Sequence, residues 1–98
     1  MTYKELKFSR VESTPDGDVM QAITRFDNGL GLSVITGPGT LTSPDRPFEA
    51  AVISFLPNGT FAIVYPDFTH GDVPSFLTGE QLSYFLSKVS KECHKYPQ

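Results

Sequence analysis

The chain has 98 residues, one cysteine and a formal net charge of −3. This length suffices for one domain with its own core, and a single cysteine excludes an intrachain disulfide. We therefore predict one domain over residues 1–98, with frayed ends at residues 1–4 and 95–98. No signal-like or membrane-length apolar run is visible, so we expect a reduced, cytoplasmic setting without membrane attachment.

The charges are unevenly distributed. Between Arg10 and Glu80 there are three arginines and nine acidic residues, whereas the lysines stand near the two ends. Clustered basic side chains are what binds a phosphate backbone, and no such cluster is visible. The eight Phe and four Tyr residues could stack on single-stranded bases, but most stand at core spacing. Nucleic-acid binding is therefore disfavoured.

Short glycine-containing turns divide the first two thirds of the chain. They are Pro15-Asp16-Gly17, Asp27-Asn28-Gly29 and Pro57-Asn58-Gly59. Glycine adopts the positive φ of a hairpin turn without a steric penalty, and Asn and Asp tolerate left-handed geometry. Together with apolar residues alternating at period two, these turns predict five hairpin-linked antiparallel strands, at Leu6–Val11, Val19–Phe26, Leu30–Ile35, Ala50–Leu56 and Thr60–Tyr65.

The strand pattern also indicates how the faces of the sheet are covered. In the third predicted strand Leu30, Leu32 and Val34 share one face. Gly31 and Ser33 occupy the other face, on which a packed neighbour or a partner can approach closely. The last two strands are apolar on both faces, which indicates that both sides are covered. One cover is the C-terminal helix, and the other is a loop, a second subunit or a binding partner.

A C-terminal helix is the most clearly marked element. Thr78 is placed to cap its start, and Gln81 completes a capping box. Lys95 suits the negative end of the helix dipole, and Pro97 cannot continue the helix. Apolar residues recur on one stripe, which we expect to face the sheet. The stripe consists of Leu82, Phe85, Leu86, Val89 and Cys93.

These elements predict an α+β fold, in which a five-stranded antiparallel meander sheet carries one C-terminal helix packed on one face. The core is expected to form between the helix stripe and the apolar face of the strands. Its predicted members are Phe8, Ile23, Leu32, Val34, Val52, Phe55, Ile63, Leu82, Phe85, Leu86 and Val89.

Two connections are longer than hairpins need, Thr36–Phe48 and Pro66–Phe76. Long loops in small domains often carry function, and the second of these is unusually apolar. We therefore expect partner-binding residues on both loops. The candidates are Leu41, Asp45 and Arg46 in the first loop and Phe68, His70, Asp72, Val73 and Phe76 in the second.

No constellation of residues predicts a reaction. His70 with Asp67 and Asp72 could form an acid–base cluster, but hydrogen bonding in a turn is the favoured interpretation. Cys93 and His94 are neighbours on the helix, so their side chains diverge by about 100° and cannot act as nucleophile and base. Metal-ligand spacings such as Cys-x-x-Cys are missing from the sequence. We therefore expect no enzymatic activity, no metal and no cofactor.

Part of the sequence resembles a group of small uncharacterised proteins encoded by bacteriophages and prophages. Those proteins share a hairpin with an Asn-Gly-x-Gly-x-Ser-Val core, a Phe/Tyr-Glu-x-Ala-Val strand and a Leu-Thr step into a final helix. The resemblance extends from Thr24 to Val89. It is carried by Arg25-Phe26-Asp27-Asn28-Gly29-Leu30-Gly31-Leu32-Ser33-Val34, Phe48-Glu49-Ala50-Ala51-Val52, Asp72-Val73 and Leu77-Thr78.

The resemblance implies a class of function. Phages encode many small acidic proteins that bind and block host machinery, including nuclease-based defence systems. The leading hypothesis is a non-catalytic phage protein that binds a bacterial host protein in the cytoplasm and blocks it, in the manner of an anti-CRISPR protein. The alternative is a homo-oligomeric phage structural or accessory protein, formed through an uncovered sheet face or edge. Nucleic-acid binding ranks third.

Overall fold

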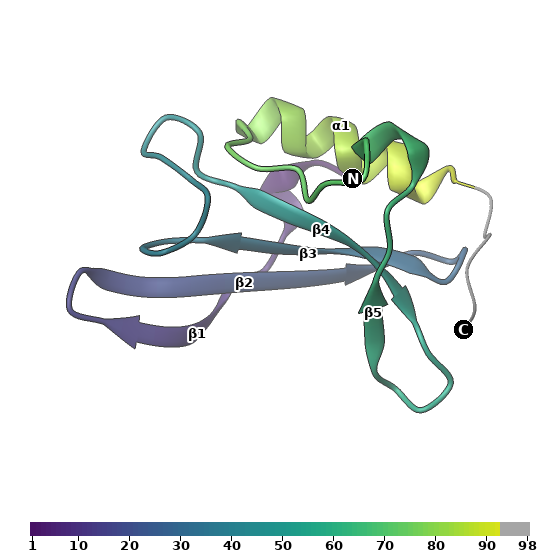
Figure 1. Cartoon of the computed structure of the whole chain (residues 1–98), viewed down its shortest axis with the longest axis horizontal. Helices are drawn as coiled ribbons and strands as arrows, with labels where there is room; N and C mark the ends of the chain where they lie inside the picture. The colour runs from purple at the N-terminus through teal and green to yellow at the C-terminus, as the bar shows by residue number, and fades with distance from the viewer. Residues whose placement is uncertain (93–98) are drawn as a thin grey trace.

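In the part of the chain that the structure describes, five antiparallel strands form one curled sheet in sequence order, with one α-helix on one side (Figure 1). The computed structural model describes residues 1–92. The sheet and the helix together confirm the predicted α+β class. The strands are β1 (Ser9–Thr14), β2 (Gly17–Arg25), β3 (Leu30–Thr36), β4 (Glu49–Phe55) and β5 (Phe61–Ile63), the helix is α1 (Gly79–Ser90), and two 3₁₀ turns are η1 (Tyr3–Glu5) and η2 (Asp67–Thr69).

The first strand lies three residues later than the sequence predicted. Phe8 stacks on Phe48 at a centroid distance of 6.0 Å, so it serves the core and not the ladder of β1 with β2. The register of that ladder also shifts between Arg10 and Glu12, which leaves Val11 as a bulge. Period-two alternation does not reveal a bulge, because the extra residue changes the phase of the pattern.

The core lies between α1 and the middle of the sheet. Leu30, Leu32 and Val34 of β3 have no exposed surface, and the stripe of α1 packs against them. The predicted core positions confirmed as buried are Leu32, Val34, Val52, Leu82, Leu86 and Val89. Phe8 and Phe85 are partly buried against this cluster, and Phe55 is half-buried on the opposite side of the sheet.

Two core predictions were wrong. Ile23 is 46% exposed and Ile63 is 49% exposed. Ile23 pairs with Ser33, and Ile63 pairs with Ile53, which itself pairs with Gly31. Both isoleucines therefore share the face of Gly31 and Ser33, which is turned away from the helix. The period of a strand separates its two faces, but it does not say which face a second layer will cover.

Side chains form hydrogen bonds with backbone groups at both ends of α1. At the start, the Gln81 N–H donates to Thr78 Oγ1 at 3.2 Å and the Thr78 N–H donates to Gln81 Oε1 at 2.9 Å, which confirms the capping box. At the end, Asn28 Nδ2 donates to the carbonyls of Val89 and Glu92, at 2.8 and 2.9 Å. The turn between β2 and β3 thus caps the helix.

The N-terminal segment is attached to the start of α1. The Tyr3 N–H donates to Ser83 Oγ at 2.9 Å, and the Tyr3 ring lies so close to Gly79 that a Cβ there would be 2.5 Å from it. The ring also contacts Phe48 at a centroid distance of 5.8 Å. The predictions made for Cys93, His94, Lys95, Pro97 and the frayed end at 95–98 lie outside the described residues.

The packing of α1 on the sheet can be tested with Leu82, which has no exposed surface. Leu82→Ala should lower the free energy of unfolding by about 2–5 kcal/mol, because it removes a buried side chain and leaves a cavity. Tyr84→Ala on the same helix is the matched control, since Tyr84 is 59% exposed and its loss should cost about 0.5 kcal/mol. Urea denaturation measures both, and equal midpoints for the two variants would contradict the packing.

Candidate binding surface

The face of the sheet that is turned away from α1 is called the open face here. Figure 1 shows it on the lower side, between the β1–β2 hairpin and the β4–β5 hairpin, with α1 on the other side. Residues directly opposite each other in antiparallel strands point to the same face, so the register of β2 to β5 defines its members. They are Gln21, Ile23, Arg25, Gly31, Ser33, Ile35, Glu49, Ala51, Ile53, Phe55, Phe61 and Ile63.

The open face exposes large apolar side chains, two of which, Phe61 and Ile63, line a hollow. Ile23 is 46%, Phe61 40% and Ile63 49% exposed. Scattered single apolar residues are ordinary on a surface, whereas several on one face mark an interaction site. The first hollow has a volume of about 320 Å³, and it is lined by Gln21, Ser33, Ile35, Glu49, Ala51, Phe61, Ile63 and Val73.

One end of the open face is closed by a stack of side chains. The Phe55 ring lies directly on Gly31, where a Cβ would be 2.9 Å from Phe55 Cε2 and 2.0 Å from the Thr24 carbonyl oxygen. The Arg25 guanidinium lies 4.7 Å from the centroid of the same ring, and Phe61 meets its edge at 6.0 Å. The small residue at position 31 therefore serves packing within the chain, which is one of the two interpretations its sequence pattern allowed.

The fifth position in the sheet is filled by two separate segments. The Val64 N–H donates to the Val52 carbonyl, which ends the β5 pairing. Two residues earlier on β4, the Ala50 N–H donates to the Pro74 carbonyl, and Phe48 and Leu77 exchange both of their backbone hydrogen bonds. Residues 65–73 therefore leave the sheet and return to it beside their point of departure. The sequence indicated a loop here but not its return to β4.

A second hollow adjoins the first and contains three of the predicted partner-binding residues, Leu41, Asp72 and Val73. Its volume is about 550 Å³, and Glu49 and Val73 line both hollows. Glu49 Oε1 accepts a hydrogen bond from the Leu41 N–H at 2.9 Å, which ties the first long loop to β4. Tyr65, which is 50% exposed, completes the apolar part of the wall.

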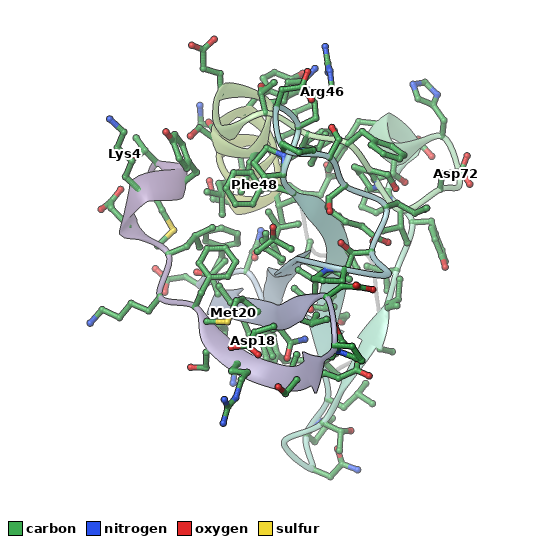
Figure 2. All side chains as sticks on the ribbon, turned by 90° about the vertical axis from the view of Figure 1, so that its left-hand side faces the viewer. Lys4, Asp18, Met20, Arg46, Phe48 and Asp72 are labelled. Atoms are coloured by element: carbon green, nitrogen blue, oxygen red, sulfur yellow. The ribbon has the colours of Figure 1, made fainter. Side chains whose placement is uncertain are left out.

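Phe76, Arg46 and Asp45 lie beside this second hollow. The Phe76 N–H donates to the Leu41 carbonyl, and Arg46 Nη1 donates to the Phe76 carbonyl and to Gln81 Oε1. Phe76 is 44% exposed and has a φ of 52°, a conformation that a bulky side chain rarely adopts. Figure 2 shows Arg46 and Asp72 in the upper part of the view, above Asp18 and Met20.

Asp45 lies in a tight turn on the exposed surface. A hydrogen bond from the Ser43 hydroxyl, together with backbone hydrogen bonding and the charge of Arg46, lowers the pKa of the Asp45 carboxyl below its usual value. The Ser43 and Arg46 backbones bond to each other across this turn. Asp45 therefore remains ionised at neutral pH and shapes its own turn.

The other two predicted residues, Phe68 and His70, stand on the excursion itself. Phe68 packs on Phe85 at a centroid distance of 6.0 Å and belongs to the rim of the core, with the Lys88 ammonium 5.9 Å from its ring. His70 ends η2 with a left-handed φ of 54°. His70 and Asp67 are joined by a hydrogen bond between their backbones. Partner binding by these residues stays a prediction.

Sequence reasoning missed several residues of the open face, chief among them Gln21, Ile35 and Glu49. The available signal was the apolar character of the last two strands on both faces. Within residues 1–92, no three His, Cys, Asp or Glu side chains are grouped so that they could hold a metal ion. None of the helices in that range is both long enough and apolar enough to span a bilayer.

Comparison of the chain with protein families, with curated proteins and with solved structures found no match. The surface itself therefore carries the argument about function.

Gly31 provides a test of how the open face is built. Gly31→Ala should lower the free energy of unfolding by about 3 kcal/mol, because its Cβ would overlap the backbone of β2 and the Phe55 ring. Ser33→Ala on the same strand and face is the control. It removes only the hydrogen bond from Gln21 Nε2, and should cost about 1 kcal/mol. A Gly31→Ala variant as stable as the control would contradict the close packing.

Proposed function

We propose that this chain is a non-catalytic binding protein that acts by occupying the surface of another protein. The observation that carries the proposal is the group of exposed apolar side chains on the open face, Ile23, Phe61 and Ile63, of which Phe61 and Ile63 line a hollow. Covering such a surface removes apolar area from water, which is the main driving force of protein association. The hollow gives a partner side chain a place to enter.

The surface continues from the open face toward the two long loops. Val73 and Glu49 connect the first hollow to the second, beside which Leu41 and Phe76 are exposed. The left-handed backbone of Phe76 supports a role in binding, because strained residues cluster at ligand clamps and recognition sites. The partner-binding residues predicted from the sequence would then form the outer part of one contact surface.

The resemblance to small phage and prophage proteins supports a more specific form of this proposal. The chain would be phage-encoded and would block a protein of the bacterial host in the cytoplasm. Multi-subunit defence nucleases are the first targets to test, because they expose assembly and substrate surfaces that a small acidic protein can occupy.

The charge on the open face favours a protein partner over a nucleic acid. Its cation, Arg25, is stacked on Phe55, and its anion, Glu49, lines the hollow. Phosphate contacts need several accessible Lys or Arg side chains. A homo-oligomeric structural or accessory protein remains the alternative, and it would cover the same apolar side chains with a second copy.

Affinity capture with matched variants tests the proposal. The tagged chain is used as bait in bacterial lysate, and a recovered protein is purified and titrated against the chain. Ile23→Lys places a charge on the open face and should weaken binding at least tenfold. Tyr84→Lys introduces the same charge on α1, on the other side of the sheet, where Tyr84 is 59% exposed, and should leave binding unchanged.

The two variants give distinct outcomes. A partner lost from Ile23→Lys and kept by Tyr84→Lys supports the open face as the contact. A partner that binds both variants equally contradicts it. Recovery of the chain alone, with light scattering showing an oligomer that Ile23→Lys disrupts, moves the assignment to the homo-oligomeric alternative.

A further inference from the structure

The backbone of β5 leaves hydrogen-bonding groups directed away from the sheet. The Leu56 N–H donates to the Thr60 carbonyl at 2.8 Å and the Val64 N–H donates to the Val52 carbonyl at 2.9 Å, so residues 60 and 64 face β4. Because this direction alternates along an antiparallel strand, Ala62 also faces β4. Phe61 and Ile63 therefore turn their N–H and C=O groups outward. β5 is the last strand in the sheet order, so these groups meet no strand within residues 1–92.

The two edges of the sheet differ in how they are protected. β1 carries Arg10 and Glu12 and is interrupted by the bulge at Val11, and charges and bulges are the usual means of preventing edge pairing. The segment Thr60–Val64 contains no charged residue and no proline, and its register with β4 is regular. An edge of this kind is suited to accept another strand.

We propose that β5 pairs in an antiparallel manner with β5 of a second copy of this chain, about a two-fold axis at Ala62. Phe61 of each copy then lies opposite Ile63 of the other, and each such pair exchanges both N–H···O=C hydrogen bonds. The outward N–H and C=O groups of Phe61 and Ile63 are thus hydrogen-bonded to Ile63 and Phe61 of the second copy. One sheet runs through both copies.

The side chains at this junction are compatible with a second copy. Phe61 and Ile63 form aromatic–aliphatic pairs across the junction on the open face. Ala62 meets its equivalent on the opposite side as a non-hydrogen-bonded pair, in which the Cα atoms approach to about 4.5 Å, and two methyl groups fit there. No like charges are brought together, because the strand has none.

The pairing joins two open faces edge to edge and does not cover them, so a host protein keeps access to them, and Phe61 and Ile63 take part in both contacts. The edge uses backbone groups of β5, whereas the contact proposed above uses side chains such as Ile23. Ala62 points to the other side of the sheet and is exposed. Variants at Ala62 and at Ile23 therefore fail or succeed separately.

The test is to introduce charges of either sign at Ala62, on the two-fold axis. The wild-type chain should sediment at twice its mass of 10.8 kDa at high concentration. Ala62→Lys and Ala62→Glu should each be monomeric, because like charges face each other across the axis. An equimolar mixture of the two should recover the dimer as a mixed species. Ser13→Lys and Ser13→Glu on the exposed β1 edge are the matched controls and should remain dimeric.

A second measurement does not require the domain to fold with a charged residue at position 62. In a Cys93→Ser background, Ala62→Cys should form an intermolecular disulfide under mild oxidation, because the expected Cα separation suits that bond. A wild-type chain that is monomeric up to its solubility limit would overturn the proposal. A dimer that survives Ala62→Lys, or an Ala62→Cys variant that does not cross-link, would overturn it as well.

Discussion

The burial of the α1 stripe against β3 determines most of the remaining structure. Leu82, Leu86 and Val89 lie on Leu30, Leu32 and Val34, all of them almost free of exposed surface. Each such side chain contributes about 1.5–3 kcal/mol when it is removed from water. A helix is about 10–12 Å across and strands are about 4.8 Å apart, so one helix covers about two strands. Residues 1–92 form five strands and one α-helix, and within that range no second layer covers the opposite face.

Because one helix covers only part of one face, the fold itself leaves the open face in contact with solvent. The open face is neither fully apolar nor fully polar. Gly31 and Ser33 of β3 stand on it beside isoleucines and phenylalanines of β2, β4 and β5. At one end the chain covers itself by placing Phe55 on Gly31 and Arg25 on Phe55. Ile53, which pairs with Gly31 and Ile63, has no exposed surface, whereas Ile23 and Ile63 stay in contact with solvent. The hollow lies on the solvent-exposed part of this face, beside Phe61 and Ile63.

Local signals in the sequence were sufficient for the elements of the fold. The Asn28 and Asn58 turns, the capping box of Thr78 and the spacing of Leu82, Leu86 and Val89 depend on residues close in sequence, and each was confirmed. The choice of covered face was beyond the same reasoning, since it depends on which side of the assembled sheet α1 docks. The bulge at Val11 and the return of the chain at Pro74 were missed for the same reason, because both are defined by a partner strand and not by their own residues. For the surface, Leu41, Asp72 and Val73 were identified from loop composition, whereas Gln21, Ile35 and Glu49 come together only through the register.

The hydrogen bonds of Asn28 have a consequence for the order of folding. One side-chain amide holds carbonyl groups that lie 61 and 64 residues further along the chain, while its oxygen accepts the Leu30 N–H in its own turn. The final turn of the helix is thus completed by a hairpin made from the first third of the sequence. During synthesis the hairpin residues are made before the helix residues that they cap. Once both exist, the end of the helix and the corner of the hairpin should gain protection from hydrogen exchange in a single cooperative step.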